Sequence, residues 1–139
     1  MRKRWKVLIV LLLLVFALGY VFTGTPLFGR KVPLREAPVS SIELSWSTRR
    51  EITASNLCSD VMHTLRKACD GGPVHACPIF GYLTVHYSDG TTNGFALMPG
   101  HRFNRMDLVD MSGSGMYSVS MGEMFQTLES VGLLTKDRK

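Results

Sequence analysis

The sequence predicts an α+β protein: a single transmembrane helix at the N-terminus, then a small antiparallel sheet of about five strands with two helices packed on one face. Three patterns support this prediction: an apolar run after a basic opening, two alternating segments around a turn, and two stretches with helical spacing. The expected parts are a cytoplasmic basic tail at residues 1–6, a transmembrane signal-anchor at 7–25, a proline-containing spacer at 26–38, and an extracytoplasmic α+β domain at 39–139.

The first element is the apolar run from Val7 to Phe22, which contains no charged residue. At about 1.5 Å per residue it forms roughly 24 Å of apolar helix, close to the length of a membrane span. Slightly more cations precede the run than follow it, so we expect a single-pass protein with its N-terminus in the cytoplasm and its domain periplasmic or extracellular. The alternative is secretion after cleavage of the leader near Gly19, because Ala17 and Gly19 have the spacing that signal peptidase reads.

The net charge of +5 lies mostly in the opening segment. Four of the sixteen Lys and Arg residues precede residue 7, which leaves twelve against eleven Asp and Glu residues, a net of +1. A domain so nearly neutral gives no indication of a polyanionic partner. We therefore expect no nucleic-acid partner. The membrane, reached through the N-terminal helix, is the expected partner, beside a protein partner of unspecified identity.

The domain is expected to begin with a strand near residues 41–48, where Ile42, Leu44 and Trp46 alternate with polar residues. From Ser55 the apolar spacing becomes helical. The stripe that this helix would bury consists of Leu57, Val61, Leu65 and Ala68. Two glycines and a proline at residues 71–73 should end the helix, since glycine accepts the left-handed C-terminal turn and proline cannot continue it.

A hairpin is expected next, because Asp89-Gly90 separates two alternating runs that extend from residue 82 to residue 98. This dipeptide is typical of a two-residue type I′ turn, which would place Val85 opposite Gly94 and Thr84 opposite Phe95. A second, looser hairpin is expected from residues 106–119.

The last expected element is a helix that begins at Ser120. Ser120 and Glu123 have the spacing of a capping box, in which each side chain bonds the backbone amide of the other residue. Met124 and Leu128 then lie on the stripe that would face the sheet, and Gly132 would end the helix.

The chain has three cysteines, Cys58, Cys69 and Cys77. On one helix Cys58 and Cys69 would lie about 16 Å apart, too far for a disulfide, whose Cα atoms lie within about 7 Å. Cys69 and Cys77 instead bracket a short connection. In an oxidising compartment we expect these two to form a disulfide, with Cys58 as a free buried thiol.

A metal site is the alternative use of these cysteines. Cys69, His75 and Cys77 would be its ligands, with Cys58 or His63 as a further one. The sequence has no Cys-x-x-Cys and no His-x-x-x-His pair, which are the usual spacings of metal ligands, so the first expectation is no metal and no cofactor.

The loop around residues 98–105 is the expected binding segment, because His101, Arg102 and Arg105 are gathered in a connection between strands. No motif of a hydrolase, a P-loop enzyme or a zinc protease is present, which favours a protein without catalytic activity. The sequence therefore predicts a membrane-anchored binding or accessory module. The alternative is a small exported protein that depends on a thiol or a metal at Cys69, His75 and Cys77.

Overall fold

The computed structural model describes the backbone of residues 2–23, 29–113 and 115–135, and on the first helix it describes the side chains of residues 5–18. The elements in chain order are α1 (Arg2–Thr23), β1 (Val39–Ser45), β2 (Arg49–Ile52), α2 (Ser55–Arg66), β3 (Cys69–Gly72), β4 (Gly81–Tyr87), β5 (Thr92–Pro99), β6 (Arg105–Asp110), β7 (Met116–Ser120) and α3 (Met121–Ser130).

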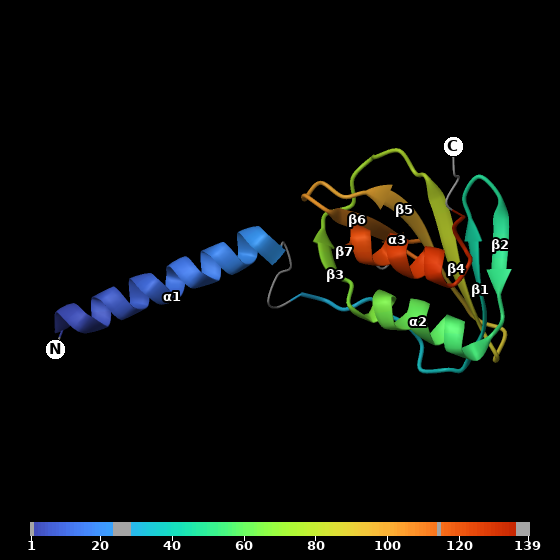
Figure 1. Cartoon of the computed structure of the whole chain (residues 1–139), viewed down its shortest axis with the longest axis horizontal. Helices are drawn as coiled ribbons and strands as arrows, with labels where there is room; N and C mark the ends of the chain where they lie inside the picture. The colour runs from blue at the N-terminus through green and yellow to red at the C-terminus, as the bar shows by residue number, and fades with distance from the viewer. Residues whose placement is uncertain (1, 24–28, 114, 136–139) are drawn as a thin grey trace.

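The strands form one antiparallel sheet of seven strands in the order β2-β1-β4-β5-β6-β7-β3. Figure 1 shows α2 and α3 side by side across one face of this sheet. The expected number of five strands is wrong, because β2 and β3 were not predicted. Both are four-residue strands at the two edges of the sheet, and neither carries the apolar alternation by which a strand is recognised in a sequence.

The expected transmembrane anchor at residues 7–25 has to be corrected. The segment is helical, as α1, but no helix in the described part of the chain is long and apolar enough to cross a membrane. The predicted single-pass topology, with the domain outside the membrane, depended on this anchor and is withdrawn with it.

The hairpin β4–β5 is present, but its expected register is wrong by one residue. Val85 pairs with Asn93 and Thr84 with Gly94. The turn has three residues rather than two, because the amide of Tyr87 donates to the carbonyl of Thr91, and Gly90 takes a left-handed conformation with φ +82°. The observed register brings Leu83 beside Phe95, so that two fully buried side chains share the core face.

The core lies between the helices and the sheet. The central strands supply Ile42, Leu83, Phe95 and Leu108, and the helices supply Val61, Leu65, Met124 and Leu128. At the start of α3 the hydroxyl of Ser120 accepts a hydrogen bond from the amide of Glu123, as the capping box requires. The carboxylate of Glu123 instead pairs with Lys67 on the neighbouring helix, so only one of the two expected capping bonds forms.

The packing of α3 on the sheet predicts the effect of two substitutions on the same helix. Leu128 is fully buried, whereas Gln126 is exposed. Leu128→Ala should lower the free energy of unfolding by about 2–5 kcal/mol, because it removes buried methyl groups and leaves a cavity. Gln126→Ala should change it by less than about 0.5 kcal/mol. Urea unfolding followed by circular dichroism measures both values, and equal losses would contradict the described packing.

Candidate functional site

The sheet face opposite the helices carries a row of buried side chains. Met106 and Leu108 of β6 point into the core, so the alternation of the strand places Asp107 on the other face. The register continues this row across neighbouring strands, because Asp107 pairs with Met98 and with Ser118. All three side chains are at most 4% exposed, so a further part of the chain must cover them.

Residues 73–80 cover this row. This segment leaves β3 at one edge of the sheet and enters β4, which lies beyond β7, β6 and β5. His75 Nε2 lies 3.2 Å from Asp107 Oδ2, which places the segment over the buried row. At its far end the amide of Phe80 donates to the carbonyl of Leu97, and the ring of Phe80 lies 4.5 Å from that of Trp46.

The loop between β5 and β6, residues 100–104, supplies the other half of the site. The amide of Gly100 donates to the carbonyl of Arg105 at 2.9 Å. A Cβ atom at residue 100 would lie only 2.5 Å from that carbonyl oxygen, so this close turn requires glycine. Asn104 takes a left-handed φ of 54°, and its carbonyl accepts a hydrogen bond from the amide of Met121. The loop is thus held at both ends, with His101 between them.

The two segments bring together His75, Cys77 and His101, which we call the Cys-His cluster. One ligand atom from each residue lies within 4.8 Å of the other two. Cys77 Sγ is 3.9 Å from His101 Nε2, and the two imidazole rings lie with their centroids 3.8 Å apart. His75 and Cys77 are half-buried and His101 is exposed, so the cluster opens to solvent on one side.

Each nitrogen of His75 has a different environment. Nε2 bonds to the buried carboxylate of Asp107, whereas Nδ1 is buried and has no hydrogen-bond partner among the described residues. A buried polar atom without a partner costs about 1–3 kcal/mol, so such atoms are rare. A carboxylate on one nitrogen of a histidine is also the usual arrangement when the other nitrogen binds a metal ion.

The donor atoms of the Cys-His cluster suit a tetrahedral metal ion. With Zn–S near 2.3 Å and Zn–N near 2.0 Å, a sulfur and a nitrogen on one zinc ion lie roughly 3.5 Å apart. The observed 3.9 Å from Cys77 to His101 is slightly wider. For this pair, a side-chain movement of a few tenths of an ångström reaches the zinc geometry, and the other donor pairs lie within 4.8 Å. Three protein ligands leave one of four coordination positions open.

The expected disulfide between Cys69 and Cys77 is wrong. Both are free thiols, as is Cys58. Cys69 is buried in β3, with its sulfur 3.9 Å from the carbonyl oxygen of Ser118, whereas Cys77 lies beside His101. The sequence could not show this separation, because it depends on where β3 pairs and where the following segment crosses the sheet.

The other residues singled out from the sequence lie apart from the cluster or beside it. Arg105 is 8% exposed, and its guanidinium donates to the carbonyl and hydroxyl oxygens of Ser118. Burial lowers the pKa of Arg105. Arg102 is exposed beside His101. The proposed binding roles of His101, Arg102 and Arg105 stay predictions. Cys58 contacts the carbonyl of Ile52 at the opposite side of the sheet.

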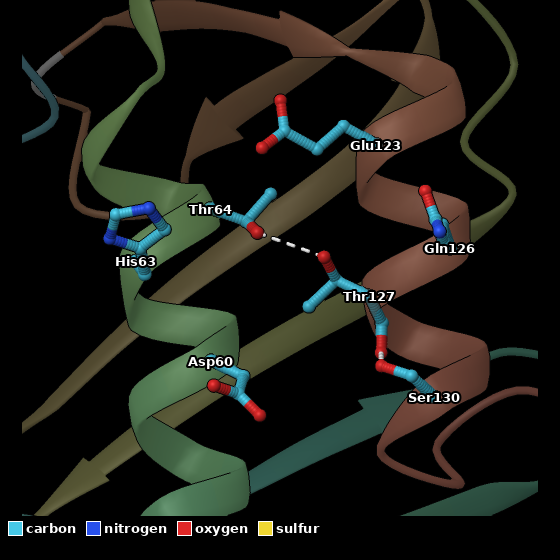
Figure 2. A pocket seen from close by; sticks show the side chains of 7 residues that line it. All are labelled: Asp60, His63, Thr64, Glu123, Gln126, Thr127 and Ser130. Carbon is cyan, nitrogen blue, oxygen red and sulfur yellow. Dashed lines mark hydrogen bonds between the residues drawn. The ribbon is translucent and has the colours of Figure 1, made fainter.

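A second hollow lies between α2 and α3, with a volume of about 330 Å³ (Figure 2). His63 and Asp60 line it from α2, and the hydroxyls of Thr64 and Thr127 bond to each other at 2.9 Å across its floor. Among the described residues, however, the Cys-His cluster is the one group of three His, Cys, Asp or Glu side chains close enough to hold a single metal ion. This hollow therefore gives no equivalent set of donors.

Comparison with protein-family models, with curated proteins and with solved structures found no match. The geometry of the Cys-His cluster is therefore the main indication of function.

The three thiols should differ in their reaction with iodoacetamide. Cys77 is half-buried and should react within the native protein, whereas Cys58 and Cys69 are at most 5% exposed and should react only after unfolding. Burial also raises the pKa of Cys58, which lowers the fraction of the reactive thiolate at a given pH. Peptide mass spectrometry after timed alkylation measures the order. If both Cys69 and Cys77 were protected from alkylation until the protein is reduced, the described free thiols would be contradicted.

Proposed function

We propose that this protein is a zinc-binding module and that His75, Cys77 and His101 are its metal ligands. The observation that carries this proposal is the cluster of three donors from His75, Cys77 and His101, in which His75 also has a buried Nδ1 atom without a hydrogen-bond partner among the described residues. Imidazole and thiolate are the donors that zinc takes in proteins. The proposal keeps two ligands of the sequence-based alternative and replaces Cys69 with His101.

The environment of the cluster supports a metal ion in three ways. Asp107 bonds Nε2 of His75 and so leaves Nδ1 for the ion. Arg105 lies two residues before Asp107 on the same strand, and its positive charge attracts the carboxylate. The backbone of the His101 loop is fixed by Gly100 and by its contact with α3. A preorganised set of donors binds a metal more tightly than donors that must first be ordered.

The number and exposure of the donors favour an accessible metal rather than a closed structural centre. Structural zinc sites use four protein ligands, whereas sites that exchange a water or a substrate use three. The Cys-His cluster has three, and His101 is exposed. The core on the other face of the sheet does not include the cluster, so the fold does not depend on the metal.

The full chain should bind one zinc ion, and the binding should require each member of the cluster. Cys77→Ser, His75→Ala and His101→Ala should each weaken zinc binding at least about 100-fold, because each leaves only two protein ligands. His63→Ala is the matched control, since His63 lines the hollow between the helices. Isothermal titration calorimetry with reduced protein gives stoichiometry and affinity. Equal binding by Cys77→Ser and the parent chain would refute the proposal.

Asp107 should act as a positioning residue. Asp107→Asn should weaken zinc binding about 10–100-fold without changing the stoichiometry, because it removes the charge that orients His75 and increases its basicity. Thermal unfolding of the metal-free variant controls for damage to the sheet. Ser118→Ala is a second control, because it alters the same buried row without touching His75. If Ser118→Ala lowers both zinc affinity and metal-free stability as much as Asp107→Asn does, the effect of Asp107 is structural.

A further inference from the structure

We propose that the open metal position binds an apolar carboxylate, with the carboxylate on the metal and the apolar part against Val74, Ile79 and Phe103. This inference rests on the proposed zinc site and identifies its ligand class. The carboxylate belongs either to a free short-chain acid or to the C-terminus of an apolar peptide, because the two present the same chemistry.

The first argument is the exposure of three apolar side chains next to the metal ligands. Phe103 is 100% exposed, Val74 60% and Ile79 48%. Each is within two residues of a member of the Cys-His cluster, so its Cα lies within about 7.6 Å of the Cα of that ligand. Outside α1, only two other large apolar side chains of the described residues are exposed to a similar extent, Tyr82 and Met111. Exposed apolar side chains this close along the chain to the cluster offer apolar surface to a ligand bound there.

The second argument is charge. Zinc with one thiolate and two neutral imidazoles has a net charge of +1, and an anion as the fourth ligand neutralises it. Residues 73–80 and 100–104 contain no Asp or Glu, and Arg102 is exposed beside His101. The carboxylate of Asp107, which bonds to His75, is 4% exposed. The two segments that carry the cluster therefore add no negative charge of their own against an anion.

The two arguments together select the ligand. A small inorganic anion would satisfy the charge but would leave the apolar side chains in water. A neutral apolar molecule would cover those side chains but would leave the open position to water. A carboxylate with an apolar tail satisfies both requirements, and binding forms one metal–oxygen bond as a bound water leaves.

The test uses the full chain loaded with Co²⁺, whose visible absorption reports ligand exchange. Loading is measured first: if Co²⁺ does not bind, the metal site itself is refuted. Acetate, butyrate and hexanoate are then titrated. Affinity should increase between about twofold and fourfold for each added methylene group, as expected for partial to full burial. Equal affinities for acetate and hexanoate in a cobalt-loaded protein would overturn the inference and leave the metal site standing.

Two substitutions test whether the apolar tail of the carboxylate contacts Phe103 and Ile79. Phe103→Ala and Ile79→Ala should reduce the preference for hexanoate over acetate at least about threefold while leaving cobalt affinity unchanged. Met111→Ala is the matched control, because Met111 is 62% exposed but lies in the β6–β7 turn, at the opposite end of β6 from residues 100–104. If neither Phe103→Ala nor Ile79→Ala alters the preference, the proposed contact is refuted.

A final pair of probes distinguishes the source of the carboxylate. N-acetyl-alanyl-leucine binding more tightly than hexanoate assigns the site to a peptide C-terminus, and weaker binding assigns it to a free acid. The same peptide as its C-terminal amide should not alter the cobalt spectrum. Equal binding of the acid and the amide would overturn the requirement for an anion.

Discussion

The hydrogen bond between His75 and Asp107 is the contact on which the site depends. It joins the segment at residues 73–80 to the face of the sheet that the helices leave uncovered. It also occupies Nε2, so the buried Nδ1 atom must find another partner or pay about 1–3 kcal/mol for its burial. The proposed metal ion would be a partner that also satisfies Cys77 and His101, the other two donors that meet at this place.

The two faces of the sheet have different roles. The helix face is apolar and contains the large buried side chains that stabilise the fold. The other face buries a polar row that includes Asp107 and Ser118, and Arg105 satisfies Ser118 through two hydrogen bonds. Buried polar groups specify one arrangement because each must find its partner. The sheet thus supplies a base, and two connections above it carry the residues of the Cys-His cluster, as in many sites built on loops.

The sequence predicts elements whose signals are local. The stripe of α2, the β4–β5 hairpin and the cap at Ser120 each depend on neighbouring residues. It fails where the result depends on pairing across the chain. The short strands β2 and β3 gain their conformation from the edges of the sheet, and the hairpin register was decided by Leu83 and Phe95 meeting in the core.

The candidate site shows the same limit. The sequence names His75 and Cys77 only in its metal-dependent alternative, and His101 only as a residue of the binding loop. No spacing in the sequence joins Cys77 to His101, which are 24 positions apart. Cys69, the third residue of that alternative, is not part of the Cys-His cluster, and its sulfur lies 3.9 Å from the carbonyl oxygen of Ser118. To predict the cluster, one would have to know that residues 73–80 cross over β6. That crossing follows from the position of β3 at the edge of the sheet, beyond β7.

X-ray absorption spectroscopy of the zinc-loaded full chain tests the central claim most directly. The account predicts a four-coordinate ion with one sulfur at about 2.3 Å, two imidazole nitrogens at about 2.0–2.1 Å and one further light atom. A shell without sulfur, or one with two sulfurs, would contradict it.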